Sequence, residues 1–283
     1  MPVPSVTFIS SLHNCLPHTR AMLSSLAATV DLANHQLVLV DDASSDGTPD
    51  FLQTLAQRPE ITVIENAENR GFAASNNIAV AAARHPILLF INNDLEFSGS
   101  WLPPMLDALK NAPKAGAVGN VQRNFATGLV DHAGIFFDLD GLPTHAHKNR
   151  RNPPSGTLIQ RNAVTAACMA IEKEIFLGVG GFDETYRNGC EDVDLCMKLK
   201  GEGYHLYVAL ESIVRHHISV SPGRNKYNDY NTQIFRKKWA KQSSKYGQQE
   251  WPKEYYRRYA RYWWRMNPRL AAKALVLLAT GRS

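Results

Sequence analysis

The chain has 283 residues, of which 44% are hydrophobic and 20% are charged, and its formal net charge is +5. This composition is typical of a soluble globular protein, and no apolar run is long enough to span a membrane. The first residues lack the basic and apolar segments of a secretory leader, so we expect a cytoplasmic protein. The four cysteines are irregularly spaced, which favours buried thiols over disulfides or a zinc site.

Charge is distributed unevenly along the chain. Residues 222–283 hold 15 Lys and Arg against 3 Asp and Glu, which leaves 16 against 23 in residues 1–221. The same C-terminal segment holds 12 of the 26 aromatic residues. We therefore expect a domain at residues 1–221 and a basic, helical extension at residues 222–283.

Three interpretations of this extension remain open. It could pack on the domain, bind a membrane interface, or bind nucleic acid. Packing explains the aromatic residues, whereas interfacial binding explains both the aromatic residues and the charge. A peripheral contact with the inner face of the cell membrane is therefore a hypothesis, and we expect no nucleic-acid partner because no binding module is recognisable elsewhere.

Apolar runs of strand-like composition alternate with helical segments over the first hundred residues. The predicted strands cover residues 6–10, 36–40, 61–65 and 87–91. This β-α-β rhythm predicts an α/β fold, with a mostly parallel central sheet and helices on both faces. The chain has no GxGxxG after the first strand and no GxxxxGK[ST], which argues against a dinucleotide or P-loop site.

The stretch HPILLFINNDLEF, from His85 to Phe97, ends a buried strand in polar residues. In open α/β sheets, ligands bind at the carboxyl ends of the strands. Asp94 is therefore a candidate ligand-binding residue. A polar turn that merely ends the strand explains the same residues equally well.

Weaker signals follow in the second half of the domain. We expect a helix at 101–111, strands at 115–121, 163–171 and 207–210, and a short helix at 172–177. The segment 122–160 is expected to be irregular, with one hairpin in which His145 and His147 are exposed. Another helix starts after Cys190, and its first turn carries Glu191, Asp192 and Asp194, which is more acid than the helix dipole needs.

Five motifs follow one another along the chain: VDDASSDGT at 40–48, ENRGFAASNN at 68–77, LLFINNDLEF at 88–97, GGFDE at 180–184 and EDVDLCMKL at 191–199. In this order they resemble the inverting family 2 glycosyltransferases of the GT-A (Rossmann-like) fold, in particular a bacterial branch with rhamnosyltransferase-like enzymes. The resemblance covers roughly residues 5–221.

The resemblance implies a site for the nucleotide of a nucleotide-diphosphate sugar. Asp41 or Asp42 is expected to bind the nucleobase. The flanking donor-site residues are expected to be Ser10, His13, Asn69, Arg70 and Asn93. The guanidinium of Arg70 suits a phosphate because it donates from a planar fork.

The resemblance also implies a Mg²⁺ or Mn²⁺ ion bound across the diphosphate. Asp94 corresponds to the last acid of the family's DxD-type motif, but Asn92 replaces the first acid. The metal is therefore expected to need a second protein ligand, for which His216 is the first candidate and His217 the second.

Asp192 resembles the general base, with Glu191 as the alternative. In an inverting single displacement one carboxylate takes the proton of the acceptor hydroxyl while its oxygen attacks the anomeric carbon. Asp183 is expected to contact a donor or acceptor sugar, or to cap its local turn.

The sequence thus predicts a hexosyl- or deoxyhexosyltransferase that acts on a saccharide or lipid-linked saccharide, in bacterial cell-surface polysaccharide synthesis. A non-catalytic protein that binds sugar nucleotides or glycans is one alternative. A sugar nucleotidyltransferase is another, but SLHNCLPHTR at 11–20 lacks the glycines that such a phosphate loop needs.

Overall fold

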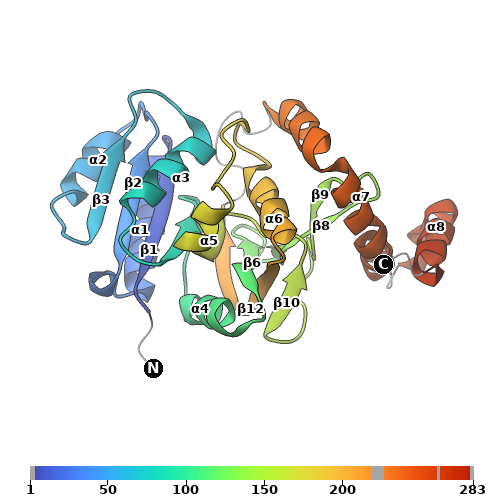
Figure 1. The fold of residues 1–283 in the computed structure, drawn as a ribbon. Helices are drawn as coiled ribbons and strands as arrows, with labels where there is room; N and C mark the ends of the chain where they lie inside the picture. Colours follow the sequence, from blue (N-terminus) through green and yellow to red (C-terminus); the bar gives the residue numbers. More distant parts are fainter. Residues whose placement is uncertain (1–3, 218–225, 260–261, 281–283) are drawn as a thin grey trace.

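A computed structural model describes residues 4–217, 226–259 and 262–280. Strands and helices alternate through the first half (Figure 1). In chain order these elements are β1 (Val6–Leu12), α1 (Leu16–Thr29), the 3₁₀ helix η1 (Leu32–Asn34), β2 (Gln36–Asp41), α2 (Thr48–Leu55), β3 (Ile61–Glu65), α3 (Gly71–Ala82) and β4 (Ile87–Ile91).

After β4 come the remaining elements of the described chain, which include both the shortest and the longest strand as well as the longest helix. These are β5 (Leu95–Glu96), α4 (Leu102–Asn111), β6 (Ala115–Asn124), β7 (Val130–His132), β8 (Ile135–Phe137), β9 (Pro143–His145), β10 (Leu158–Arg161), β11 (Cys168–Glu172), α5 (Lys173–Gly178), α6 (Glu191–Gly201), β12 (His205–His216), α7 (Asn228–Tyr259), the 3₁₀ helix η2 (Trp263–Arg265) and α8 (Pro268–Ala279).

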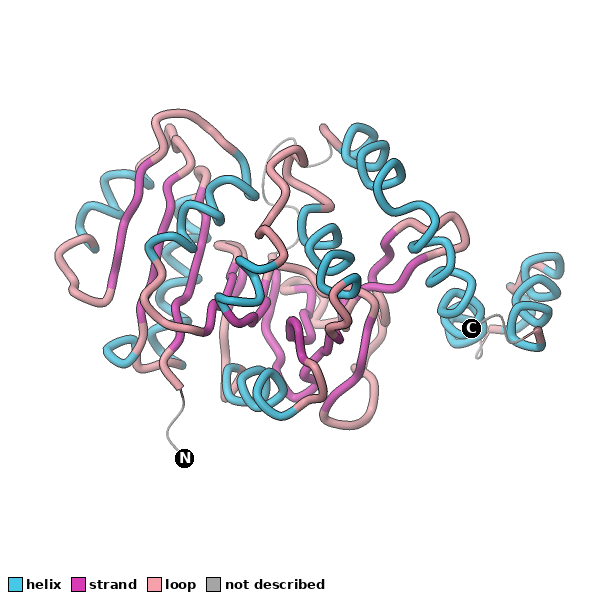
Figure 2. The backbone as a smooth tube through the Cα atoms, viewed as in Figure 1, coloured by secondary structure: helices cyan, strands magenta, loops and turns pink. Residues whose placement is uncertain are grey.

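One mixed sheet of ten strands forms the centre of the molecule, with the main order β10-β12-β6-β11-β4-β1-β2-β3 (Figure 2). Strands β1 to β4 run parallel, and so do β6 and β12. Strand β11 joins the two parallel groups because it runs antiparallel to both β4 and β6. The carboxyl ends of β1, β2, β4, β6 and β12 therefore meet at one edge, which we call the carboxyl edge.

Both faces of the sheet are covered, as strand β4 illustrates. Leu88 and Phe90 pack in the core with α3, α5 and α6, while Leu89 and Ile91 pack in the core with α1, α2 and α4. Successive side chains of a strand point to opposite faces, so a strand covered on both sides is apolar throughout. The predicted α/β fold with helices on both faces is confirmed.

Strands β11 and β12 depart most from their predicted bounds. Strand β11 begins at Cys168 instead of residue 163, because Val164 binds the Cys196 thiol and Ala166 donates to the Asp192 side chain. Strand β12 continues through a bulge after Ala209, so that it ends at His216. A bulge breaks the alternation of side chains, which is why the predicted strand covered only residues 207–210.

Helix α7 packs on the domain. Phe235 is fully buried in the same core as α3, α5 and α6, and its ring stacks on Phe137. Asn231 exchanges two hydrogen bonds with the backbone of Arg187. The packing interpretation therefore holds for α7, whereas a domain boundary at residue 221 stays a prediction. Among the described residues, no helix is both long and apolar enough to cross a membrane.

Candidate functional site

The acid-rich loops predicted from the sequence lie together at the carboxyl edge. Strand β2 delivers Asp41 there, β4 delivers the loop that contains Asp94, and β12 delivers His216. Strand β5 pairs with β12 so that Leu95 lies opposite His216, and this pairing brings the β4 loop against the end of β12.

Asp42 holds the loop before α3. Its carboxylate accepts hydrogen bonds from the backbone N–H groups of Arg70 and Gly71, both at 2.8 Å, and from the side chain of Asn66 at 2.8 Å. Its carbonyl oxygen lies 2.9 Å from a ring nitrogen of His13 and accepts a 3.3 Å hydrogen bond from the Asn69 amide. The oxygens of Asp42 are thus already used within the protein.

Asp41 differs from Asp42 because one of its carboxylate oxygens has no hydrogen-bond partner among the described residues. That oxygen is buried, whereas the other accepts from the N–H of Ser44 at 3.2 Å. The hydroxyl of Ser10, fully buried on the neighbouring strand β1, is also unpaired. Because buried unpaired polar atoms are costly, each of these two atoms indicates a place where a ligand or water binds. Arg70 is exposed near this loop.

Asp94 and His216 form a buried pair. Oδ2 of Asp94 lies 3.2 Å from Nε2 of His216, and Nδ1 of His216 lies 3.8 Å from Oδ2 of Asp131 on β7. Burial alone would lower the pKa of His216, but its contacts with Asp131 and Asp94 outweigh burial and raise that pKa to about 9. The two carboxylates thus favour the protonated imidazole, and a cation bound at Nε2 would displace its proton.

Asp94 offers the carboxylate oxygens that a hard divalent cation prefers, and His216 adds a ring nitrogen. Oδ1 of Asp94 is buried and has no hydrogen-bond partner among the described residues. In residues 4–217, 226–259 and 262–280, no cluster of three or more His, Cys, Asp or Glu side chains could hold a metal ion. A cation here would therefore need further ligands from phosphates or water, as Mg²⁺ and Mn²⁺ sites in nucleotide enzymes do. The residues fit such an ion.

The other residues of the Asn-Asn-Asp loop hold its shape. The N–H of Asn92 donates to the carbonyl of Ala167 at 2.9 Å, and the Asn93 amide donates to the Thr19 hydroxyl at 3.1 Å. His217, the second candidate metal ligand, pairs instead with Glu96 at 2.6 Å.

The acids in the first turn of α6 have different surroundings. Asp194 is fully buried and accepts hydrogen bonds from Tyr186, Lys238 and Trp239. Glu191 is buried, and its carboxylate accepts the N–H of Gly189 at 2.6 Å.

Asp192 is the first-turn acid that remains partly exposed. One of its oxygens accepts the N–H of Ala166 at 3.2 Å, and the other accepts the N–H of Val193 at 2.8 Å. Since Ala167 binds the backbone of Asn92, residues 166–167 connect Asp192 to the loop that carries Asp94. The base candidate and the loop of the metal-site candidate are therefore linked through two hydrogen bonds to residues 166–167.

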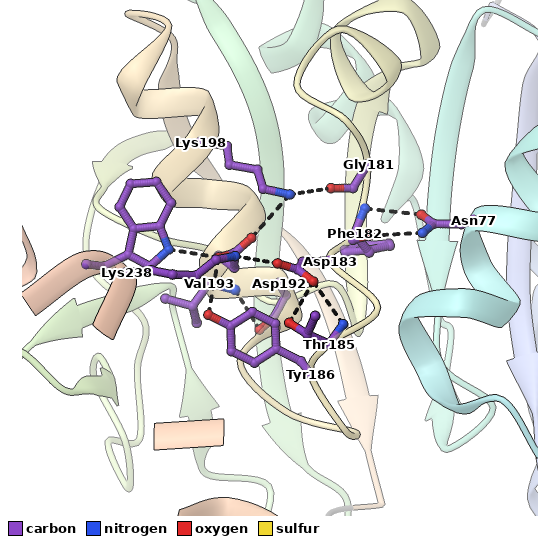
Figure 3. Close-up of polar contacts among 12 residues, drawn as sticks. Asn77, Gly181, Phe182, Asp183, Thr185, Tyr186, Asp192, Val193, Lys198 and Lys238 are labelled. Atoms are coloured by element: carbon purple, nitrogen blue, oxygen red, sulfur yellow. Dashed lines mark hydrogen bonds and ion pairs between the residues drawn. The ribbon is translucent and has the colours of Figure 1, made fainter. Parts of the chain in front are cut away.

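Asp183 caps its own turn beside α6 (Figure 3). Its carboxylate accepts the N–H and the hydroxyl of Thr185, at 2.8 and 2.7 Å, and forms an ion pair with Lys238. Burial would raise the pKa of Asp183, but these partners lower it to about 2. Of the two roles expected for Asp183, the local cap is the one visible in its contacts.

Sequence reasoning missed Asp131. This residue is buried, and it lies within 3.8 Å of His216, His145 and Lys148. The expectation that His145 and His147 are exposed is wrong, because the hairpin folds back and half-buries both side chains. The motif VDHAG at 130–134, polar and yet placed between apolar residues, was the one available signal for Asp131.

The sequence profile of glycosyl transferase family 2 matches residues 7–176. The chain belongs to this family. The matched region contains the β2 loop and the Asn-Asn-Asp loop, and the base candidate lies beyond it.

Curated relatives include a much longer protein, y4gI of Sinorhizobium fredii, which is 32% identical over 78% of this chain and 25% of its own length. The O-antigen biosynthesis protein RfbC of Myxococcus xanthus is 29% identical over 77% of this chain and 18% of its own. An N-acetylglucosaminyl-diphospho-decaprenol L-rhamnosyltransferase of Mycobacterium tuberculosis is 27% identical over 80% of this chain and 78% of its own. The chain thus spans a quarter or less of the first two.

Two solved glycosyltransferases share the fold of this family 2 chain. GalNAc-T7, determined with UDP, GalNAc and Mn²⁺, superposes with a TM-score of 0.68 at 16% identity over 86% of this chain and 49% of its own. The mannosyltransferase PcManGT of Pyrobaculum calidifontis was determined with GDP-Man and Mn²⁺. It superposes with a TM-score of 0.58 at 19% identity over 98% of this chain and 74% of its own. The GT-A fold implied by the sequence is confirmed.

Proposed function

We propose that the chain is a metal-dependent, inverting glycosyltransferase. It moves a hexosyl or deoxyhexosyl group from a nucleotide-diphosphate sugar to a saccharide or lipid-linked saccharide in bacterial cell-surface polysaccharide synthesis. The observation that carries the proposal is the position of Asp192, partly exposed at the start of α6 and connected through residues 166–167 to the loop of Asp94. The names of the Mycobacterium and Myxococcus relatives support the acceptor and the pathway class.

Asp94 and His216 would hold Mg²⁺ or Mn²⁺, with Asn92 as a further candidate. When bound, the ion neutralises the charge that develops on the leaving diphosphate. Asp131 keeps a carboxylate beside Nδ1 of His216 while Nε2 faces Asp94. A carboxylate at the second ring nitrogen fixes the orientation of a metal-binding histidine, so Asp131 is a positioning residue.

Asp41 is the nucleobase-binding residue in this proposal, because Asp42 is occupied by the α3 loop. The unpaired hydroxyl of Ser10 lies on the adjacent strand and supplies a second polar contact. The exposed guanidinium of Arg70 is suited to a phosphate oxygen.

Asp192 acts as the general base. Its carboxylate takes the proton of the acceptor hydroxyl while the hydroxyl oxygen bonds to the anomeric carbon and the bond to the diphosphate breaks. Glu191 is less suited to this role, because it is buried and bound to the loop backbone at Gly189.

The change Asp192→Asn tests this assignment. It removes the base but keeps the shape of the side chain, so transfer should fall by about 10²- to 10⁴-fold. The affinity for the nucleoside diphosphate with Mn²⁺, measured by calorimetry, should stay the same. A glycan-binding protein without catalysis would show no transfer in the wild type.

Two variants serve as controls for this experiment. Asp140→Asn, in the exposed β8–β9 turn, should leave transfer unchanged. Glu191→Gln should lower the free energy of unfolding, whereas the rate of transfer per folded molecule should change little. Full turnover in Asp192→Asn, or a loss confined to Glu191→Gln, would refute Asp192 as the base.

A further inference from the structure

The C-terminal end of the described chain exposes an unusually apolar surface. Helix α8 lies at the periphery, beyond the far end of α7 and away from the sheet (Figure 1). Trp263 and Trp264 of η2 are 71% and 62% exposed, and Leu275 and Val276 of α8 are 60% and 58% exposed. We call these residues, with Tyr262, Leu270 and Leu278, the C-terminal surface.

The position of this surface is fixed by a narrow contact. The Tyr256 hydroxyl donates to the carbonyl of Ala271 at 2.8 Å, and the Tyr255 hydroxyl accepts the N–H of Asn267 at 2.9 Å. Asn267 also caps α8, and Ala274 is the buried residue of that helix. Helix α8 is therefore anchored on α7 by one side only, while its other sides expose apolar side chains. Water is a poor solvent for such a helix.

The charge around the surface has a single sign. No Asp or Glu follows Glu254 in the sequence. The described basic residues of this region are Arg257, Arg258, Arg265, Arg269 and Lys273. A second copy of the chain would bring the same positive charge to the interface, which disfavours self-association through this face. Nucleic acid matches the charge but offers nothing in which Leu275 and Val276 can be buried.

We propose that the C-terminal surface docks on an anionic lipid bilayer, with α8 lying in the plane of the interface. Trp and Tyr rings prefer the headgroup level, and leucine and valine side chains reach the acyl boundary. The arginines bind the lipid phosphates, each adding attraction that salt screens. The proposal goes beyond sugar transfer and does not depend on it, because docking needs neither donor nor acceptor.

Sedimentation of the full chain with lipid vesicles tests the proposal. The protein should pellet with vesicles that contain phosphatidylglycerol and remain in solution with pure phosphatidylcholine vesicles. Raising the salt to about 0.5 M should release it, since the Debye length falls to a few ångströms. Equal binding to neutral vesicles, or no binding to anionic ones at low salt, would overturn the proposal.

Paired variants separate the two contributions. Trp263→Ser with Trp264→Ser should abolish sedimentation at any salt concentration. Arg265→Glu with Arg269→Glu should weaken the partition coefficient about 30-fold or more, because each basic residue contributes roughly a fivefold factor. All four side chains are exposed, so the unfolding temperature should not change.

Matched controls lie on other faces of the domain. Leu177→Ser, at an exposed leucine of α5, and Lys110→Glu, at an exposed lysine of α4, should bind vesicles like the wild type. If these controls lose binding as strongly as the C-terminal variants, the contact is unspecific and the proposal is wrong. A concentration-dependent dimer that the Trp263→Ser and Trp264→Ser changes dissolve, without vesicle binding by the wild type, would assign the surface to self-association instead.

Discussion

Two adjacent aspartates at the end of β2 have different partners. Asp42 accepts hydrogen bonds from the loop before α3, and Asp41 keeps a buried oxygen without a partner among the described residues. Successive residues at a strand end point in opposite directions, so neighbours can serve packing and binding separately.

Substitution by asparagine should separate these roles. Asp42→Asn removes the charge from the carboxylate that accepts the backbone N–H groups of Arg70 and Gly71. The free energy of unfolding should therefore fall by about 1.5–3 kcal/mol. Asp41→Asn should change that free energy less and weaken nucleoside diphosphate binding more. Urea denaturation and calorimetry on both variants measure the difference. If Asp41→Asn is the less stable variant and Asp42→Asn binds nucleotide poorly at full stability, the two assignments are reversed.

The sequence predicted candidate residues better than their partners. Asp94 and His216 were expected to approach one another, and they lie 3.2 Å apart. Asp131, in contrast, belongs to a segment without helical or strand periodicity, so no pattern connected it with His216. Contacts between residues 122 positions apart can be inferred from strand ends, whereas contacts of an irregular insertion depend on how that insertion folds back.

Among the elements, helix α7 depends on a close approach to the β8–β9 turn. A Cβ atom at Gly247 would lie 1.9 Å from the carbonyl oxygen of Asp138, whereas a Cβ at Gly201 of α6 would meet nothing within 4 Å. Gly247→Ala should therefore lower the free energy of unfolding by about 1–3 kcal/mol through overpacking. Thermal and urea unfolding measure this change.

Gly201→Ala is the control for the helix propensity of alanine. It should leave stability unchanged or raise it by up to about 1 kcal/mol, since alanine favours the helix. A Gly247→Ala protein as stable as Gly201→Ala would mean that α7 is not held against the hairpin in this way.

The first four strands were predicted within a few residues of their observed ends, because buried parallel strands are short apolar runs between loops. Strands β11 and β12 were predicted less well. Side-chain contacts shorten β11, and a bulge interrupts β12. Both features depend on partners that are distant in the sequence. Local patterns do not contain that information.

For the whole molecule, the packing of α7 partly explains why residues 1–221 are acidic and residues 222–283 are basic. Lys238 forms ion pairs with both Asp183 and Asp194 (Lys238 and Asp183 are labelled in Figure 3). Trp239 also binds Asp194. Basic residues of the extension thus neutralise acids around α6. Part of the remaining excess lies near α8, where the described residues include no acid after Glu254. Of the three interpretations of the extension, packing is observed for α7, whereas membrane binding by the surface around α8 stays a proposal.

We expect nucleotide and metal to bind together at the carboxyl edge. The most direct measurement is the unfolding temperature with UDP, dTDP or GDP, each with and without Mn²⁺, in the wild type and in Asp94→Asn. One nucleotide at about a hundred times its Kd should raise the wild-type temperature by about 5–10 °C only when Mn²⁺ is present. Asp94→Asn should lose that increase. Stabilisation that is independent of Mn²⁺, or that persists fully in Asp94→Asn, would be incompatible with a metal-diphosphate site at Asp94.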